Sequence, residues 1–190
     1  MPRSTVLDND AVLVTRLDDA SVGRGSPPIR HDSAVLVGVR DGGGSLLYQG
    51  IEEAAYFPVA RGRVDWLPPG ELSVHAGSAP FGEALLVELR SLPDAPGVTR
   101  TFGDKTLFRN ERVCVYEEIL GPGQQRPMHS HAPRLIIPLT GAHAAQRFPD
   151  GSDREDQFPA GGAHWMPRIV VHEIRNLGPA PFWAICVERA

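Results

Sequence analysis

Three histidines, placed at two points in the sequence, have the type and spacing of metal ligands. His129 and His131 are separated by one residue, so on a β-strand both side chains project from the same face. His172 follows in a later strand-like run, residues 169–174, where a neighbouring strand would supply a third ligand. Neutral imidazole suits zinc, iron, copper or nickel, and three histidines leave coordination positions open, as catalytic sites do. The residues therefore predict one metal ion held by all three histidines.

Histidines in strands usually have a structural role instead of binding a metal. A single histidine in an apolar strand is more often a hydrogen-bonded core residue than a ligand, and a His-x-His pair alone does not decide between the two roles. Further residues at fixed distances favour the metal site. Gly123 precedes the histidine pair, and Gly161, Pro167 and Asn176 frame the later histidine.

Short strands and turns dominate the rest of the chain. The 190 residues include 20 glycines and 18 prolines, dispersed along the sequence, which argues against long helices. Strands of this length and spacing indicate an all-β protein, built as a jelly roll or a small double-sheet barrel. Apolar runs bounded by turn residues predict strands at residues 12–17, 34–39, 46–48, 61–67, 72–75, 84–89 and 169–174.

The second half of the chain repeats the first with an offset close to 100 residues. An apolar run, a turn, a Trp-x-Pro sequence and a Pro-Phe pair recur in the same order. A proline-containing linker at residues 91–97 separates the halves. We predict two homologous barrel units, residues 1–98 and 99–190. Matching positions include His31 and His131, Leu36 and Ile136, Trp66 and Trp165, Pro68 and Pro167, and Val87 and Val187.

The N-terminal unit lacks the histidine set. By the offsets, Ile29, His31 and Ser73 occupy the places of the three ligands, and one histidine alone cannot hold a catalytic metal. His75 lies close to the third place but two residues out of phase. We therefore expect this unit to bind no metal and to act structurally, by covering the sheet of the active unit.

The residues around the histidines resemble the two sequence motifs of the cupin family, G-x5-H-x-H-x3–4-E-x6-G and G-x5-P-x-G-x2-H-x3-N. The spacing of the second motif is intact, with Ile169 where the family has a glycine. The first motif has a shortened spacer after the second histidine, and Arg134 stands where the family has a glutamate. The chain reads Gly123-x5-His129-x-His131 with Arg134-x6-Gly141, and then Gly161-x5-Pro167-x-Ile169-x2-His172-x3-Asn176.

The resemblance implies a bicupin: two cupin-type jelly-roll β-barrels in one all-β chain, with a metal in the C-terminal unit and a degenerate N-terminal unit. Three-histidine iron sites in cupins carry out dioxygenase chemistry, so the resemblance implies an Fe(II) dioxygenase; manganese, nickel and zinc are the alternative metals. Three neutral ligands leave the full charge on the ion, which favours a small anionic or chelating substrate.

Two other kinds of function stay open. One is a non-redox cupin enzyme, an isomerase, cyclase, decarboxylase or lyase, in which the metal acts as a Lewis acid. The other is a cupin that binds a small ligand or a metal without turnover. The substrate itself is not encoded in any motif, because pocket residues come from many strands.

Arg134 is the departure from the motif that points most directly to a substrate. A guanidinium inside the barrel would bind a substrate carboxylate with two parallel hydrogen bonds. Strict alternation from His131 aims Arg134 outward, and a bulge at Pro133 would be needed to turn it in. The alternative is a salt bridge at the surface or at an interface.

Other candidates lie on neighbouring strands. One of Glu117 and Glu118 should face the barrel interior, and Glu118 shares a face with Tyr116, so we favour Glu118 and Tyr116 as catalytic residues. A carboxyl group inside an apolar barrel has a raised pKa and serves as an acid or base. Trp165 and Trp183 are candidates for lining the substrate pocket, although tryptophans more often pack in a core.

Composition excludes several classes of partner. The net charge is −4 and no basic stripe is present, which argues against nucleic acid. No apolar run is long enough to span a membrane, and the N-terminus has no signal pattern, so we expect a cytoplasmic protein. Cys114 and Cys186 are predicted to be buried free thiols. The run 135–139 is apolar on both faces, which predicts cover by the sister unit or by a second subunit in a homodimer.

Overall fold

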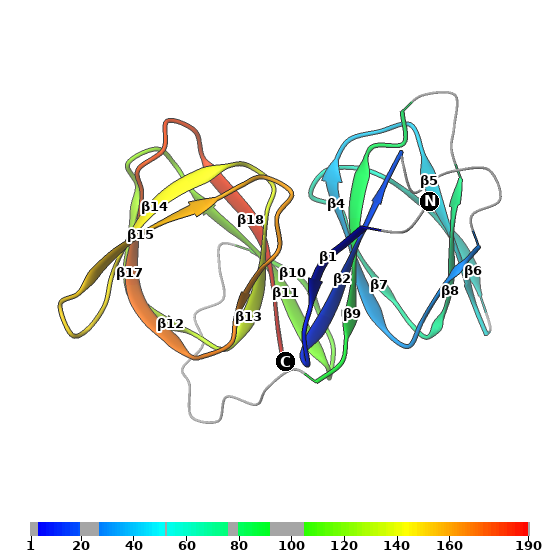
Figure 1. Cartoon of the computed structure of the whole chain (residues 1–190), viewed down its shortest axis with the longest axis horizontal. Coiled ribbons are helices and arrows are strands. Elements are labelled where there is room, and N and C mark those ends of the chain that lie inside the picture. Colours follow the sequence, from blue (N-terminus) through cyan, green and yellow to red (C-terminus); the bar gives the residue numbers. More distant parts are fainter. Residues whose placement is uncertain (1–3, 20–26, 52, 76–79, 92–104, 190) are drawn as a thin grey trace. The chain divides into compact units, whose positions relative to one another are not determined.

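The computed structural model describes residues 4–19, 27–51, 53–75, 80–91 and 105–189, and in these ranges the regular structure consists entirely of β-strands (Figure 1). Contacts between Cα atoms divide the chain into two compact units, Met1–Ser91 and Leu92–Ala190. The predicted boundary between residues 98 and 99 lies outside the described residues.

The N-terminal unit is built from two sheets. A five-stranded sheet has the order β1-β2-β9-β4-β7, and a four-stranded sheet has the order β3-β8-β5-β6. The strands are β1 (Ser4–Asp8), β2 (Val12–Asp18), β3 (Ile29–His31), β4 (Ala34–Arg40), β5 (Ser45–Gly50), β6 (Ala54–Pro58), β7 (Val64–Leu67), β8 (Gly70–His75) and β9 (Glu83–Leu89).

The C-terminal unit repeats this arrangement strand for strand. Its five-stranded sheet has the order β10-β11-β18-β13-β16, and its four-stranded sheet has the order β12-β17-β14-β15. The strands are β10 (Lys105–Arg109), β11 (Val113–Leu120), β12 (Gln125–His131), β13 (Arg134–Pro138), β14 (Ala142–Arg147), β15 (Asp153–Phe158), β16 (His164–Met166), β17 (Val170–Asn176) and β18 (Phe182–Arg189). The predicted all-β fold of two jelly-roll units is confirmed.

Each unit holds its core between its own two sheets. Alternate residues of each strand point inward, as the period of a β-strand requires. In the N-terminal unit the core includes Leu17 and Leu86 from the larger sheet and Leu46 and Leu72 from the smaller one. In the C-terminal unit the core residues are Cys114, Tyr116, Leu120, Ile136, Ala142, Ala144, Phe158, Ile174, Phe182, Ala184 and Cys186.

The predicted strands agree with the observed ones apart from their ends. The strand expected at residues 61–67 begins only at Val64, because Gly62 has a φ of 78° and forms a turn. Every residue of β13 is buried, as its apolar character on both faces predicts. Cys114 and Cys186 are buried and free, which confirms that prediction.

Two glycines and an asparagine of the motifs shape the turns beside the histidine strands. Gly123 and Gly161 have φ values of 70° and 72°, a region that residues with a Cβ rarely adopt. Asn176 is fully buried; its Nδ2 donates to the carbonyl oxygens of Leu120 at 2.9 Å and Ala180 at 2.8 Å. The asparagine of the second motif therefore ties loops together and does not face the ion site.

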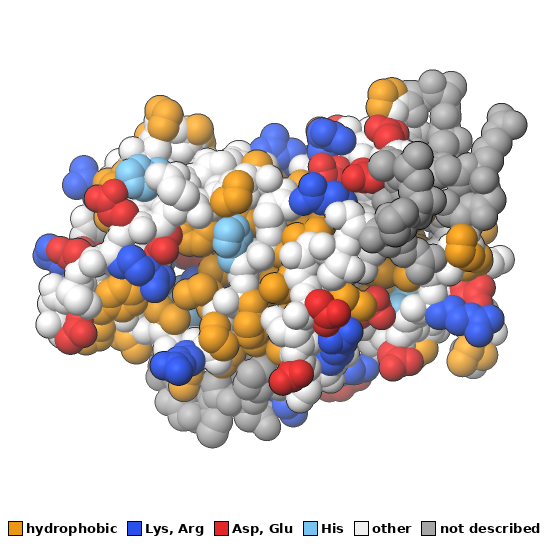
Figure 2. All heavy atoms as spheres, in the orientation of Figure 1, with side chains coloured by type: hydrophobic (Ala, Val, Ile, Leu, Met, Phe, Trp, Pro, Cys, Tyr) orange, Lys and Arg blue, Asp and Glu red, His pale blue; other side chains and the backbone are white. Residues whose placement is uncertain are grey.

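Figure 2 shows acidic and basic side chains interspersed over the visible face rather than gathered by sign. Within the described ranges, no helix has the length and apolar character needed to cross a membrane.

Candidate metal centre

The three predicted histidines come together in the C-terminal unit. Strands β12 and β17 pair in antiparallel register, with His129 directly opposite His172, and His131 follows His129 on the same face. One nitrogen from each ring forms a group whose members all lie within 4.8 Å of one another. His131 and His172 are buried and His129 is half-buried. It is the only group of this kind found among the described residues.

The protonation of the three rings follows from their hydrogen bonds. Nδ1 of His129 lies 2.7 Å from the carbonyl oxygen of Pro127, and Nδ1 of His172 bonds Oε1 of Gln146. Both oxygens only accept, so each Nδ1 carries the proton and each Nε2 keeps its lone pair. The Nε2 atoms of all three histidines are buried and have no hydrogen-bond partner in the described part of the chain. Three buried lone pairs that face one another without partners fit a divalent transition metal ion.

His131 is oriented through a tyrosine. The hydroxyl group of Tyr116 donates to Glu188 Oε1 and accepts a hydrogen bond of 3.0 Å from Nη1 of Arg134. Its oxygen lies 3.4 Å from Nδ1 of His131, so it can also accept from that N–H. Burial raises the pKa of Tyr116, which keeps the hydroxyl group protonated. Tyr116 therefore lies beside the cluster, on the face predicted from alternation with Glu118.

Buried charges of both signs surround this tyrosine. Arg134 lies inside the barrel with 3 % of its surface exposed, and its Nη2 is 3.7 Å from Oε2 of Glu118. Arg126 donates to the other oxygen of Glu118 at 3.1 Å. Together with Glu188, the group holds two guanidinium and two carboxylate groups, so its charges balance. A buried charge without such balance would be strongly unfavourable.

Arg134 thus points inward, although alternation counted from His131 aims it outward. The reason is topological. The chain leaves the four-stranded sheet at His131 and enters the five-stranded sheet at Arg134, with residues 132–133 outside both strands. Alternation starts again in the new strand, where Arg134 shares its face with the core residue Ile136. No surface salt bridge is formed.

Two polar residues of the site were not predicted. Gln146 is buried between His172 and Asp156, and its amide group bonds both. Glu188 is fully buried and bonds Tyr116. The offset of 100 could have indicated Gln146. It matches Gln146 with Leu46 of the sister unit, an apolar residue, and so predicts that Gln146 faces the interior. Glu188 lies two residues after the core residue Cys186 on β18, so it shares the inward face of that strand.

The two tryptophans are not brought to the histidines. Trp165 pairs with Leu135 across the sheet. Its neighbour Met166 packs on the core, so Trp165 points to the opposite face of the strand. Trp183 lies between the core residues Phe182 and Ala184, and its Nε1 donates to Oε1 of Glu117 at 3.2 Å. Both therefore lie on the opposite face of the five-stranded sheet from the core, where they do not line a pocket around the ion site.

The sister unit carries apolar side chains at the corresponding positions. Strands β3 and β8 pair Ile29 with Leu72 in the register that pairs His129 with His172. The residue at the third ligand position is therefore Leu72, and the predicted Ser73 is wrong. The offset between the units is 99 at the Trp-x-Pro sequence but 100 in the strand that follows, so an offset of 99 misplaces this position by one residue. Ile29 and Leu72 both belong to the N-terminal core cluster. Among the ligand positions only His31 keeps a histidine.

Gln146 is expected to hold His172 in its metal-binding orientation. Replacing it by leucine, the residue at this place in the sister unit, removes the acceptor for the Nδ1 proton. We expect the affinity for Zn²⁺ or Co²⁺ to fall about 10- to 100-fold, as for partners of ligating histidines in general. Competition with a chromogenic chelator measures the change. Gln157→Leu, at an exposed position on β15, is the matched control and should leave the affinity unchanged. Equal metal affinities of the wild type, Gln146→Leu and Gln157→Leu would show that Gln146 does not orient His172 for metal binding.

The stability of the metal-free protein should fall in acid. Burial lowers the pKa of His172 to about 3 and also lowers those of His129 and His131. The unfolded chain, with histidine pKa values near 6.5, therefore binds more protons than the folded chain below that pH. The contribution of these histidines to the free energy of unfolding is complete above about pH 6.5. It is lost as the pH falls from there toward the pKa of the folded state, by about 1.4 kcal/mol per pH unit for each such histidine.

Urea unfolding of chelator-treated protein between about pH 7.5 and pH 5 tests this dependence. His172→Gln should flatten the slope over this range, since one of the titrating groups is gone. A slope that is the same in the variant and the wild type would show that His172 does not titrate as its burial requires.

Comparisons with known proteins support the fold. No protein-family model and no curated protein sequence matches the chain. Among solved structures, an oxalate decarboxylase from Lactobacillus farciminis in complex with formate aligns over 97 % of this chain and 85 % of its own, with a TM-score of 0.62 and 11 % identity. The oxalate decarboxylase of Bacillus subtilis, studied for its Mn(II) centres, aligns over 98 % of this chain and 75 % of its own, with a TM-score of 0.56 and 11 % identity.

A cupin domain from Bordetella pertussis also matches, with 25 % identity, a TM-score of 0.43, and coverage of 50 % of this chain and 99 % of that one. The longer alignments, together with the two repeated units, define the class: this is an all-β chain with the duplicated cupin fold. The fold that the motif resemblance implies is thereby confirmed, and the three-histidine group lies where the motifs place it, in the C-terminal unit.

Proposed function

We propose that the chain is a metal-dependent enzyme of the cupin fold that acts on a small anionic metabolite able to chelate the ion. The observation that carries the proposal is the set of three buried Nε2 lone pairs without hydrogen-bond partners among the described residues. His129, His131 and His172 would hold the ion. When bound, the ion would supply Lewis acidity or, if it is iron, electron transfer.

Charge supports an anionic substrate. All three ligands are neutral, since burial lowers their pKa values. The two arginines and two glutamates beside them balance one another, so the charge of the ion remains uncompensated. Arg134 is already engaged by Tyr116 and Glu118, so its role is to fix Tyr116 and the hydrogen bond to His131. The ion, rather than Arg134, would attract the substrate.

The first candidate for the reaction is Fe(II)-dependent dioxygenation, which the cupin motifs with three histidines imply. Tyr116, held protonated by burial, donates its hydroxyl proton to Glu188 in a hydrogen bond, so its part would be to hold His131, and Glu118 and Glu188 would balance the charges of the two arginines. The second candidate is non-redox decarboxylation of a small dicarboxylate. It is favoured by the oxalate decarboxylases among the structural neighbours, of which one is described by its Mn(II) centres.

Metal analysis of protein purified without added metal is the first test. Iron, with O₂ consumption on catechol as a chelating probe, supports dioxygenation. Manganese, with CO₂ release from oxalate, supports decarboxylation. Stoichiometric metal with no turnover of either probe favours a protein that binds without catalysis. Absence of any bound metal, also after incubation with Fe²⁺, Mn²⁺, Ni²⁺ or Zn²⁺, would contradict the metal site itself.

A further inference from the structure

A hydrogen-bond chain connects the three-histidine centre to the surface of the C-terminal unit. Nδ1 of His172 bonds Oε1 of Gln146, and Nε2 of the same amide donates to Oδ2 of Asp156 on β15. Nε of Arg154 donates to this Oδ2 at 2.7 Å. Gln146 is 3 % exposed, whereas the side chains of Asp156 and Arg154 are 28 % and 48 % exposed. The hydrogen-bond chain therefore begins at a buried ring and ends in solvent.

Strand register places these side chains on one face of the four-stranded sheet. Gln146 on β14 pairs with Ile174 on one side and with Arg154 on the other. Asp156 pairs with Ala144. Ile174 and Ala144 belong to the core, and residues directly opposite each other in an antiparallel pair share a face. The three polar residues of β14 and β15 therefore all project toward the inside of the barrel.

The carboxylate of Asp156 determines which way the amide of Gln146 faces. A glutamine amide has a donor end and an acceptor end, so it can be placed in two orientations. A carboxylate only accepts, so the NH₂ group must face Asp156 and Oε1 must face His172. This oxygen only accepts in turn, so the proton of His172 is on Nδ1 and the lone pair of Nε2 faces the other two histidines.

Arg154 would favour the opposite orientation if Asp156 were absent. Its guanidinium only donates, so it would pair with Oε1 of Gln146. It is held close by, since its Cζ lies 5.4 Å over the ring of Phe148, which itself stacks on His172. The NH₂ group would then face Nδ1 of His172 and place the proton on Nε2. A protonated Nε2 cannot bind an ion.

The sister unit lacks the hydrogen-bond chain as well as the ligands. Strand register matches its members with apolar residues only: Leu46 for Gln146, Phe57 for Arg154 and Val59 for Asp156. These residues belong to the N-terminal core or pack against it. Apolar side chains fill such positions at a lower cost in free energy than polar ones do. The polar set thus occurs in the unit that has the three histidines.

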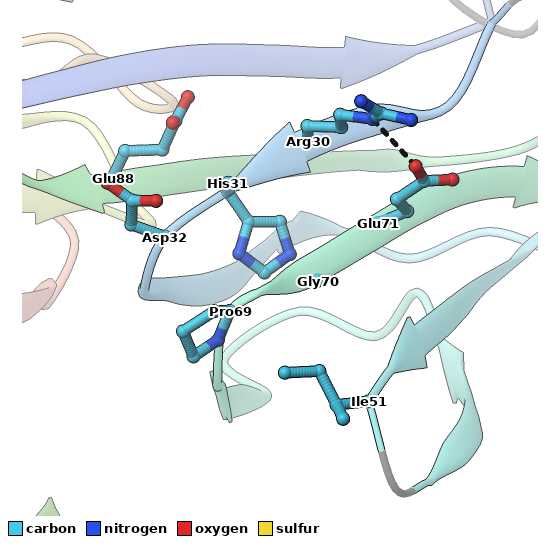
Figure 3. A pocket seen from close by; sticks show the side chains of 8 residues that line it. All are labelled: Arg30, His31, Asp32, Ile51, Pro69, Gly70, Glu71 and Glu88. Atoms are coloured by element: carbon cyan, nitrogen blue, oxygen red, sulfur yellow. Dashed lines mark hydrogen bonds and ion pairs between the residues drawn. The ribbon is translucent and has the colours of Figure 1, made fainter.

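The histidine that the sister unit keeps has no comparable partner. His31 lies at a hollow in which Arg30 and Glu71 pair with each other at 2.7 Å (Figure 3). Neither ring nitrogen of His31 has a hydrogen-bond partner within the described ranges, so no neighbour there selects its tautomer. In the C-terminal unit the hydrogen-bond chain from Asp156 selects that of His172.

An ordinary surface ion pair is the alternative explanation of Asp156. Its carboxylate pairs with Arg154, and partly exposed pairs of this kind contribute little to stability. Such a pair would leave His172 unaffected. The hydrogen bond from Gln146 distinguishes the two explanations, because it gives the same carboxylate oxygen a buried partner that contacts a ligand.

We propose that Asp156 is a positioning residue of the metal centre, which keeps His172 in the metal-binding tautomer by holding the amide of Gln146 in one orientation. The consequence for metal affinity rests on the function proposed above, since it concerns the same centre. The tautomer itself requires no ion, and it can be measured in the metal-free protein.

The test compares the full-length wild type with Asp156→Val, which introduces the residue of the sister unit. Long-range ¹H–¹⁵N correlation spectra of metal-free protein labelled with ¹⁵N-histidine report which ring nitrogen carries the proton. We expect Nδ1–H for His172 in the wild type, and Nε2–H or a mixture of the two forms in Asp156→Val. The His172 signals are assigned by their loss in His172→Gln. His129, whose Nδ1 bonds the carbonyl oxygen of Pro127, should keep its pattern in both proteins.

Metal affinity supplies the second measurement. The Co²⁺ affinity, obtained by competition with a chromogenic chelator, should fall about tenfold in Asp156→Val. Asp153→Val is the matched control, because it breaks the exposed pair with Arg147 on the same strand, and it should behave as the wild type in both measurements.

A double variant separates the orientation of the amide from general damage to the fold. Gln146→Glu combined with Asp156→Val should restore both the Nδ1–H tautomer of His172 and the Co²⁺ affinity. A carboxylate at position 146 has no donor end, so it accepts from His172 and from Arg154 whichever way it faces. A merely structural loss in Asp156→Val would not be restored by this second change.

The proposal is overturned if His172 keeps Nδ1–H in Asp156→Val, or if the Co²⁺ affinity of this variant equals that of the wild type. It is also overturned if the double variant folds but restores neither property. A wild type that binds no Co²⁺ would contradict the proposed metal function instead, and the tautomers of the metal-free proteins would still decide the role of Asp156.

Discussion

Replacing His129 or His172 by alanine is expected to abolish metal binding under conditions in which the wild type binds one ion per chain. Structural Zn²⁺ sites with four ligands gain ~10–16 kcal/mol, so one ligand contributes roughly 3 kcal/mol, or about 100-fold in affinity. With only three protein ligands available here, the loss of one leaves a two-histidine pair. Isothermal titration with Zn²⁺ or Co²⁺ measures the affinity, and metal content after dialysis checks it. Any activity found should fall in parallel.

The matched control for these variants is His143→Ala. His143 lies in the same unit, but its Nε2 is 2.7 Å from Glu155 and it does not belong to the histidine group. It should bind metal as the wild type does. The thermal midpoint supplies a second readout, since an ion that binds only the folded state raises it. Added Zn²⁺ should raise the midpoint of the wild type and of His143→Ala, but not that of His129→Ala. If His129→Ala keeps wild-type affinity, the site assignment is wrong.

The sequence was most informative where one short motif carried the information. His129 and His131 share a face because alternate residues of a β-strand point to the same side. His172 was assigned to the same site because the residues around it have the spacing of the second motif. The fold followed from turn residues and from the repeat. These features depend on local geometry, which a single sequence expresses directly.

The surroundings of the histidines depend on pairings between strands that are distant in the sequence. Arg134 faces inward because the chain changes sheets just before it, and alternation within one strand does not extend across such a change. Gln146 meets His172 across the β14–β17 pair, whose register no local pattern defines. Trp165 and Trp183 were assigned to a pocket from their residue type alone, and the faces of their strands place them elsewhere.

Arg134→Met is expected to cost about 3–5 kcal/mol of folding free energy, the range for removing one partner of a buried ion pair. Methionine keeps much of the side-chain volume, so loss of charge is the main change. Glu118 and Tyr116 then lose a cationic partner inside the barrel, where water cannot replace it. Urea unfolding of the metal-free protein measures the loss. Arg147→Met breaks a solvent-exposed pair with Asp153 and should leave the stability close to that of the wild type.

The sister unit shows how the same positions are filled without charge. Ala34 lies opposite Glu88 as Arg134 lies opposite Glu188, and Leu17 lies opposite Ala84 as Glu118 lies opposite Ala184. A double variant, Arg134→Met with Glu118→Leu, should therefore recover much of the stability lost in Arg134→Met, because it removes both charges of the pair together. Its metal affinity should stay below that of the wild type, since Tyr116 and thus His131 are less firmly held. If the double variant is no more stable than the sum of the two single changes predicts, the two charges do not stabilise each other and the ion-pair explanation fails.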